Sequence, residues 1–248
     1  MSLFADLEDC PVKYKILILD NNSGDDLNDI SEYYKDKEIY VIYSEKNLGF
    51  GGGHNYLSGF ENSNYMLILN SDIKFLQKGS ILELYNVLSK SNMYKLAGPC
   101  LITEDYLPQP FDHGELKGFM SGIKNNYGSS YWKHRNRQTE AAWVSGAVFM
   151  IETDLFKKLG GFDEKFFLYK EEEELCKRIR DAGEKILYYP EVKVMHYGHV
   201  VAKRSEHFSD SMNYYLEKHF KNKLSYKILN VIKSAKDILF YGKVKARE

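Results

Sequence analysis

Two short apolar runs, each followed at once by carboxylate and amide residues, constrain the fold of this chain most strongly. Residues 15–19 (KILIL) are followed by Asp-Asn, and residues 65–69 (YMLIL) are followed by Asn-Ser-Asp. Continuous apolar runs of this length are typical of strands that are buried on both faces of a parallel sheet. The chain therefore predicts buried strands whose ends carry polar side chains.

Helical patterns alternate with strand patterns along the rest of the chain. Apolar spacing predicts helices over residues 27–36, 56–61, 79–90, 154–159 and 171–182, and strands over residues 39–43, 96–98, 143–151, 185–188 and 192–195. This alternation predicts an α/β fold with an open, mixed but mostly parallel sheet flanked by helices. Residues 104–140 lack strong periodicity and are expected to form a long functional loop. Residues 209–248 are expected to form a basic helical extension.

Composition excludes several other classes of protein. The chain has 248 residues, 44% of them hydrophobic, and a formal net charge of −1. A nearly neutral chain has no global field that attracts nucleic acid, so no nucleic-acid partner is expected. No apolar run approaches the roughly 18–20 residues of a membrane-spanning helix. The three cysteines have no paired spacing, which favours a reducing, cytoplasmic location.

Polar residues at the expected strand ends predict a ligand site. Ligands of open α/β sheets bind beyond the carboxyl ends of the strands. Asp20 and Asn21 follow one apolar run, and Asn70, Ser71 and Asp72 follow another. A carboxylate at the end of a buried strand favours a cationic partner, such as a divalent cation that bridges to a diphosphate. The alternative is an ordinary turn that caps the next segment.

Four consecutive glutamates, residues 171–174, open an expected helix. One interpretation is a solvated first turn, where the helix dipole favours acidic side chains. The other rests on the apolar run at 166–169, which would hold this helix start against the core. Glu171 and Glu174 then share one face of the helix, and a partly buried carboxylate there is suited to act as a general base.

The glycine run and one histidine have weaker signals. Gly49, Gly51, Gly52 and Gly53 match neither a P-loop nor a dinucleotide-binding fingerprint, so they indicate only that the backbone passes close to something. His196 directly follows an expected strand. A metal ligand and a structural histidine are both open interpretations there.

Seven motifs in order give the chain a resemblance to a known family. They are Asp-Asn-Asn-Ser at 20–23, Asn-Leu-Gly-Phe-Gly-Gly-Gly-His-Asn at 47–55, Leu-Asn-Ser-Asp at 69–72, Trp-Val-Ser-Gly-Ala at 143–147, Gly-Gly-Phe-Asp-Glu with Phe-Phe at 160–167, an acidic segment at 171–178, and Pro190 with His196. Together they resemble family-2 glycosyltransferases of the GT-A fold, especially the rhamnosyltransferase-like bacterial branch. The resemblance covers about residues 15–200.

The resemblance implies an inverting glycosyltransferase that builds a bacterial surface polysaccharide. Its donor would be a nucleotide sugar, UDP- or dTDP-linked, and its acceptor a saccharide or a lipid-linked saccharide. Mg²⁺ or Mn²⁺ would offset charge on the leaving diphosphate. By motif position the resemblance implies catalytic Glu172 with Glu171, metal ligands Asp72 and His196, acceptor-side Trp143, Glu174 and Arg178, and donor-binding Asp20, Asn21, Ser23, Asn47, Gly49, Gly53, Asn55, Asn70, Ser71, Asp72 and Gly146.

Three features depart from the family pattern. Glu172 and Glu174 stand where the family has aspartates, and Asn70 stands where a stricter motif has aspartate. The family's usual first strand, which helps to clasp the nucleoside, is absent before residue 15. The expected organisation is therefore a shortened GT-A-like domain over residues 1–208 followed by the extension at 209–248. A non-catalytic homologue that binds sugar nucleotides or glycans is the alternative function.

The remaining expectations concern partners. Residues 217–248 hold nine Lys/Arg residues against three acidic ones, with apolar residues interleaved. A basic amphipathic helix of this kind binds anionic membranes, so we hypothesise a peripheral contact with the inner face of the plasma membrane. The alternative is a helix that packs on the domain. The unpaired sheet edge left by the absent strand favours a homodimer, and residues 104–140 are expected to shape the acceptor side.

Overall fold

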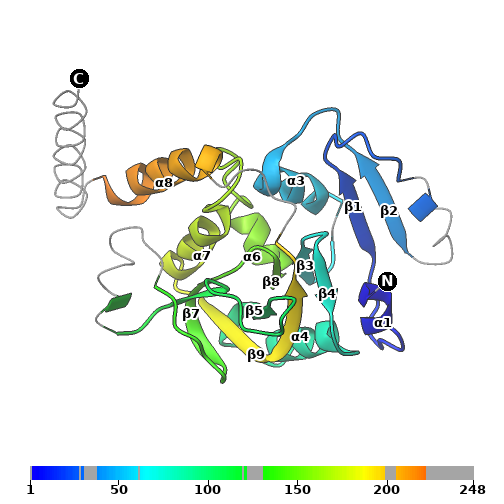
Figure 1. Ribbon diagram of the computed structural model, residues 1–248, viewed down its shortest axis with the longest axis horizontal. Helices are drawn as coiled ribbons and strands as arrows, with labels where there is room; N and C mark the ends of the chain where they lie inside the picture. Colours follow the sequence, from blue (N-terminus) through cyan, green and yellow to red (C-terminus); the bar gives the residue numbers. More distant parts are fainter. Residues whose placement is uncertain are drawn as a thin grey trace.

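The computed structural model contains two separate β-sheets with helices on their faces (Figure 1). It describes residues 2–27, 29–30, 38–60, 62–118, 120–121, 131–198 and 205–221. The smaller sheet pairs β1 (Ile16–Asp20) with β2 (Ile39–Tyr43) in parallel. The larger, seven-stranded sheet has the order β3-β8-β5-β9-β7-β6, with β4 also paired to β9. Its strands are β3 (Tyr65–Leu69), β4 (Ile73–Phe75), β5 (Tyr94–Ile102), β6 (His113–Glu115), β7 (Thr139–Val144), β8 (Val148–Glu152) and β9 (Lys185–His196).

The larger sheet is mixed, as expected, but most of its strand pairs are antiparallel, so the expectation of a mostly parallel sheet was wrong. Within the larger sheet β5 and β9 run parallel, and the pairs β3–β8, β5–β8, β7–β9, β6–β7 and β4–β9 are antiparallel. An apolar run reports that a strand is buried on both faces, and it carries no information on the direction of its neighbours. The sheet is therefore mixed, with helices on both sides.

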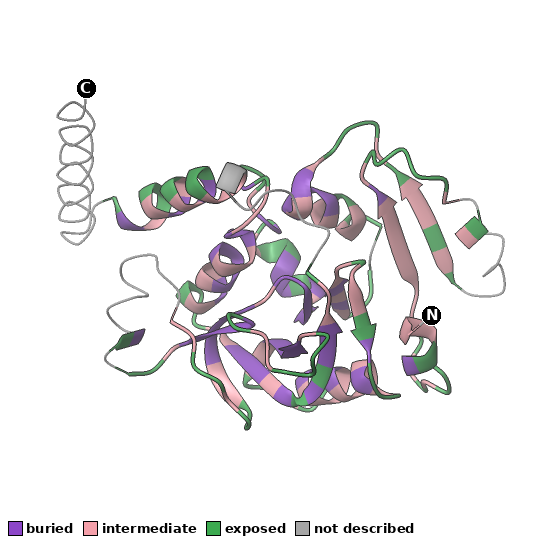
Figure 2. Ribbon diagram, viewed as in Figure 1, coloured by how far each residue is buried: buried purple, intermediate pink, exposed green. Residues whose placement is uncertain are grey.

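Two cores lie on opposite faces of the larger sheet, and buried residues are frequent along its strands (Figure 2). One face is covered by α6 (Thr153–Lys158) and α7 (Glu171–Asp181), and the other by α4 (Ser80–Ser89). Strand β5 shows the alternation, because Leu96 belongs to the α6–α7 core and Ala97 to the α4 core. The helices predicted over residues 79–90, 154–159 and 171–182 are thus confirmed, with small differences at their ends.

Two expected strand boundaries differ in the structure. The single strand predicted over 143–151 is divided into β7 and β8 by a turn at residues 145–147. Conversely, the two strands predicted over 185–188 and 192–195 are one strand, β9. Its pairing with β5 jumps from Tyr189 to Lys193, so Pro190 lies in a bulge, which is where a sheet tolerates proline.

The glycine-rich stretch predicted as a loop is mostly helix α3 (Gly49–Ser58). A Cβ on Gly49 would lie 2.5 Å from the carbonyl oxygen of Phe167, and one on Gly51 would lie 2.8 Å from Cβ of Phe162. The glycines therefore let α3 pack closely against residues 162–171. The inference that backbone approaches something here is confirmed, and the partner is the chain itself.

Strands β1 and β3 are each paired on one side among the described strands, to β2 and β8 respectively. The unpaired edges are those on which the homodimer hypothesis rests. Residues 28 and 31–36 of the helix predicted over 27–36 lie outside the described residues.

Helix α8 (Ser205–Phe220) crosses the proposed boundary at residue 208. Ser211 Oγ donates to the carbonyl oxygen of Leu168 at 2.8 Å, and Tyr214 Oη donates to Asp163 at 2.8 Å. Tyr215 and Phe220 bury their rings beside Phe166. The first part of the proposed extension thus packs on the α/β domain, whereas residues 222–248 lie outside the described residues. In the part of the chain that is described, no helix is long and apolar enough to cross a membrane.

Candidate functional site

The two residues that precede the acidic start of α7 have an unusual backbone conformation. Tyr169 and Lys170, the two residues before the helix, have φ values of 72° and 73°, a left-handed conformation that side chains other than glycine adopt rarely. Such strain persists where surrounding packing determines it, often at functional sites. Buried Lys170 donates to Glu173 at 2.7 Å, which fixes the orientation of the turn.

Glu171 and Glu172 share this turn, but their environments differ. Glu171 is 4% exposed and packs towards Gly51 of α3, and its Oε2 atom is buried without a hydrogen-bond partner. Glu172 is partly buried, and its Cβ lies 3.5 Å from the position that a Cβ on Gly146 would take. Burial, with the charge of Glu173, raises the pKa of Glu172 to about 7. A carboxyl group that titrates near neutral pH has the properties of a general base.

The two predicted metal ligands are brought together. Asp72 lies in the turn between β3 and β4, His196 ends β9, and their Oδ1 and Nε2 atoms are 3.4 Å apart. Asp72 Oδ2 and His196 Nε2 are both buried without a hydrogen-bond partner. Burial lowers the pKa of His196, which favours the neutral ring that binds metal ions. Within the described residues there is no group of three His, Cys, Asp or Glu side chains arranged to hold a metal.

Gln109 was not anticipated from the sequence, and it touches this pair. Its Oε1 lies 3.0 Å from Nδ1 of His196. When the amide oxygen accepts the Nδ1 proton, Nε2 is left as a bare acceptor that faces the Asp72 carboxylate. Two facing acceptors repel unless a cation or a proton lies between them, so the residues present fit a divalent cation.

The residues at the end of β1 that are predicted to bind the nucleotide sugar form a hydrogen-bonded turn. Asp20 accepts from the backbone N–H of Ser23 at 3.0 Å and from its hydroxyl at 2.5 Å, and these bonds lower the pKa of Asp20. Asn21 donates to Asn47 at 3.2 Å and to the carbonyl oxygen of Gly49 at 3.1 Å. The end of β1 and the start of α3 are therefore held together.

Other residues predicted to bind the nucleotide sugar make contacts that support the fold. Asn55 donates to the carbonyl oxygen of Phe162 at 2.9 Å and accepts from its N–H at 2.8 Å, so it holds α3 to the following loop. A Cβ on Gly53 would lie 3.1 Å from Leu19. Asn70 donates its backbone N–H to Ala147 at 2.9 Å, which places the Asn70–Ser71–Asp72 segment beside the turn that carries Gly146. Ser71 is exposed next to Asp72.

The residues predicted on the acceptor side make contacts within the fold: Trp143 and Glu174 are buried, and Arg178 is partly exposed. Trp143 is 5% exposed and lies in the core, because it faces Gly114, whose added Cβ would lie 2.0 Å from the indole nitrogen. Glu174 is fully buried and pairs with Arg178, whose Nε donates to it at 2.9 and 2.8 Å. Arg178 also donates to the carbonyl oxygens of Leu159 and Gly161, at 2.7 Å each. These contacts support the fold, and the role of these residues on the acceptor side stays a prediction.

Sequence reasoning also missed a buried network centred on Asp112. Asp112 is 1% exposed and accepts hydrogen bonds from Tyr188 Oη at 2.9 Å and from the N–H of Leu101 at 3.2 Å. Nδ1 of His113 lies 2.7 Å from the same carboxylate, and its ring stacks on Tyr188 with centroids 3.7 Å apart. No spacing signal marks this pair, because its partners come from strands that are distant in the sequence.

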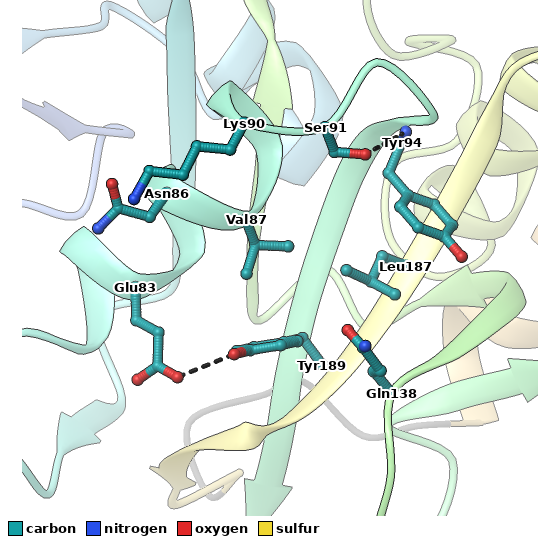
Figure 3. Close-up of a pocket in the computed structure, with 9 residues that line it drawn as sticks. All are labelled: Glu83, Asn86, Val87, Lys90, Ser91, Tyr94, Gln138, Leu187 and Tyr189. Carbon is teal, nitrogen blue, oxygen red and sulfur yellow. Dashed lines mark hydrogen bonds between the residues drawn. The ribbon is translucent and has the colours of Figure 1, made fainter.

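A groove of about 380 Å³ lies elsewhere, between α4 and strands β5 and β9 (Figure 3). Glu83 accepts a hydrogen bond from Tyr189 there at 2.9 Å, and Leu187 and Tyr94 also line it. Tyr94 begins β5, whereas His196 ends the parallel strand β9. The groove is therefore at the opposite end of the sheet from the Asp72–His196 pair, and none of the predicted site residues lines it.

The comparisons with known proteins agree with this geometry. A family model described as "Glycosyl transferase family 2" matches residues 5–160, more than half of the chain. The chain belongs to glycosyltransferase family 2. A second model, described as "N-terminal domain of galactosyltransferase", matches residues 128–203, the part that contains Gly146 and the acidic turn.

Sequence relatives of this glycosyltransferase include two rhamnosyltransferases. Rhamnosyltransferase WbbL of Escherichia coli (strain K12) is 26% identical over 223 residues, which cover 84% of this chain and 81% of the relative. The N-acetylglucosaminyl-diphospho-decaprenol L-rhamnosyltransferase of Mycobacterium tuberculosis (strain ATCC 25618 / H37Rv) is 26% identical over 144 residues, covering 54% of this chain and 47% of that protein. The expected rhamnosyltransferase-like branch is thus confirmed.

Solved structures confirm the GT-A fold. The crystal structure of GalNAc-T7 with UDP, GalNAc and Mn²⁺ matches with a TM-score of 0.69 and 16% identity, over 91% of this chain and 45% of that one. This glycosyltransferase thus has the enzyme fold expected from its motifs, and the similar structure was solved with a divalent cation.

Proposed function

We propose that this glycosyltransferase moves a sugar from a UDP- or dTDP-linked donor to a saccharide or lipid-linked acceptor, with inversion, in the synthesis of a bacterial surface polysaccharide. The observation that carries the proposal is that the turn at residues 145–147 contacts both groups of residues: Gly146 packs against Glu172, and Ala147 binds Asn70 of the segment that contains Asp72. The rhamnosyltransferase relatives support this class of donor and acceptor.

In the proposed reaction, the Glu172 carboxylate takes the proton from the attacking acceptor hydroxyl. The hydroxyl oxygen bonds to the anomeric carbon from the face opposite the leaving group, and the bond to the nucleoside diphosphate breaks. We assign the base to Glu172 because Glu171 is 4% exposed and packed towards α3. Asp20 and Asn21 would contact the nucleoside from the turn at the end of β1.

Asp72 and His196 would hold the divalent cation, with Gln109 orienting the histidine ring. When bound, Mg²⁺ or Mn²⁺ supplies positive charge that offsets the charge developing on the diphosphate. The partnerless buried atoms Asp72 Oδ2 and His196 Nε2 support this assignment. A diphosphate donor would complete the oxygen ligands that hard cations prefer.

Substitution of Asp72 by alanine is expected to abolish metal-dependent nucleotide binding. In wild-type protein, Mn²⁺ with the correct nucleoside diphosphate should raise the melting temperature, because ligand at 100-fold its Kd adds about 2.7 kcal/mol to stability. UDP, dTDP and GDP are compared by thermal shift. The control is Asp105→Asn, an exposed carboxylate in the 104–140 loop, which should keep the shift. An undiminished shift in Asp72→Ala would contradict the metal site.

We also propose that residues 222–248 contact an anionic membrane surface, on the basis of their lysines and interleaved apolar residues. Replacement of Lys233, Lys236, Lys243 and Lys245 by glutamine should reduce flotation with vesicles of phosphatidylglycerol at least tenfold, since each basic residue near such a surface contributes about 1 kcal/mol. The matched control replaces four exposed lysines of the domain, Lys74, Lys90, Lys133 and Lys165. Equal flotation of both variants would refute the contact.

A further inference from the structure

Two aromatic rings stand partly exposed beside the proposed site. Phe111 is 53% exposed, and its ring centroid lies 6.3 Å from that of Trp132, with the ring planes tilted by 45°. Phe111 adopts a φ of 63°, a conformation that a bulky side chain takes only under constraint. The backbone therefore presents this apolar ring outwards instead of burying it, although large aromatic side chains normally add to a core.

Trp132 is held in place by buried polar groups. Its indole N–H donates to Asp112 at 2.9 Å, and Asp112 is 1% exposed. Arg135 donates to both oxygens of Glu115, at 2.6 and 2.7 Å, and the N–H of Glu115 donates to the carbonyl oxygen of Tyr131 at 2.8 Å. These bonds fasten the segment around Trp132 to β6, so the position of the indole ring is set before any ligand binds.

Residues 109–112 form hydrogen bonds with both parts of the proposed site, the turn beside Glu172 and the Asp72–His196 pair. The carbonyl oxygen of Asp112 accepts from the N–H of Ser145 at 2.8 Å, in the turn whose Gly146 packs against Glu172. Gln109, two residues before Phe111, contacts His196 at 3.0 Å. The aromatic pair is therefore joined directly to the side of the general base and to the side of the metal pair.

We propose that Phe111 and Trp132 form a platform on which a sugar ring of the acceptor stacks. The inference rests on the proposed function, and it places the acceptor sugar on two partly exposed rings, whereas Trp143 and Glu174 are buried. The C–H face of a pyranose is apolar and matches an aromatic face, whereas its hydroxyl groups stay hydrated at the edge. A pre-positioned ring loses little conformational freedom when the sugar binds.

Tryptophan fluorescence tests the platform directly. The chain has two tryptophans, and Trp143 is buried, so the difference between wild type and Trp132→Phe isolates the emission of Trp132. Methyl glycosides of hexoses, 6-deoxyhexoses and N-acetylhexosamines, with N-acetylglucosaminyl-diphospho-farnesol and farnesyl diphosphate, are titrated into the full chain. A sugar on the platform should change the Trp132 emission, while farnesyl diphosphate, which has no sugar, should leave it unchanged.

Kinetics provides the second readout. Phe111→Ala should raise the acceptor KM about tenfold and leave the donor KM unchanged, whereas Tyr106→Ala, an exposed aromatic on the same loop, should change neither. If no glycoside alters Trp132 emission, or if Phe111→Ala leaves the acceptor KM unchanged, the platform is refuted. Nucleotide binding with Mn²⁺ is measured separately, so failure of the proposed function would show as its loss in wild-type protein.

Discussion

Replacement of Glu172 by glutamine is expected to lower the turnover of donor and acceptor by about 10²- to 10⁴-fold, the usual contribution of a positioned general base. The amide keeps the shape of the side chain but does not accept the proton of the acceptor hydroxyl. Nucleotide binding with Mn²⁺ should remain, because Glu172 lies at the start of α7 and the metal pair lies on the β3–β4 turn and β9. Steady-state kinetics and thermal shift on the same protein separate the two effects.

The pH dependence sharpens this prediction. Because the pKa of Glu172 is raised to about 7, wild-type turnover should rise with pH through neutrality as the carboxylate forms. The matched control is Asp181→Asn at the other end of α7, an exposed carboxylate that pairs with Lys177 at 2.7 Å. It should keep both the plateau rate and the midpoint of the pH profile. A Glu172→Gln enzyme within threefold of wild type would refute the assignment.

The raised pKa also has a consequence for stability. A carboxyl group whose folded-state pKa lies above its unfolded value stabilises the fold at low pH, and this contribution is lost as pH rises through the folded-state pKa. Between about pH 4.5 and 7 the ionisation of Glu172 therefore costs stability. Glu172→Gln should accordingly melt at a higher temperature than wild type at pH 8, which is the opposite of a general folding defect.

Replacement of Glu174 by glutamine is expected to lower the free energy of unfolding by about 3–5 kcal/mol, the cost of breaking a buried ion pair. Glu174 is fully buried, and its Oε1 lies 2.7 Å from Nζ of Lys218 and 3.1 Å from Nε2 of His219, both on α8. Its removal leaves these groups and Arg178 without their shared anion. Urea denaturation at pH 7 measures the loss.

Acid should weaken the same cluster. Hydrogen bonds from His219, Arg178 and Lys218 outweigh burial and lower the pKa of Glu174 to about 2. A lowered carboxyl pKa contributes stability that is complete above the unfolded value of 4.5 and disappears as pH falls towards about 2. Wild type should therefore lose stability over this interval, and Glu174→Gln should lose less.

The control for this cluster is Glu217→Gln on the same helix. Glu217 is exposed and pairs with exposed Lys221 at 3.1 Å, and pairs of this kind contribute about 0–1 kcal/mol. If both variants unfold at the same urea concentration, the contacts of Glu174 with Lys218 and His219 are not an important source of stability. A large difference would show that α8 belongs to the folded domain.

The acidic turn at the start of α7 is connected to α8 through Glu174, which contacts Lys218 and His219. Through Arg178, Glu174 holds the carbonyl oxygens of Leu159 and Gly161 at the start of the segment that runs to Lys170. Motif position alone gave Glu174 and Arg178 a role with the acceptor. In the structure Glu174 is fully buried and Arg178 is partly exposed, and Arg178 donates to the carbonyl oxygens of Leu159 and Gly161.

Much of the local structure was determined by the sequence alone. The apolar runs at 15–19 and 65–69 predicted β1 and β3, and the apolar spacing at 79–90 and 171–182 predicted α4 and α7. These signals are local, because burial on one or both faces imposes a period on neighbouring residues. The ordered motifs likewise led to the family and to the Asp72–His196 pair.

Only the tertiary structure decided the remaining features. Strand direction, the close packing that requires Gly49, the buried roles of Trp143 and Glu174, and the Asp112 network that orients Trp132 depend on residues distant in sequence. A residue type states which contacts it can make, whereas the fold selects the partner that it meets. That is why the acidic turn was found from the sequence and the proposed acceptor platform was found only in three dimensions.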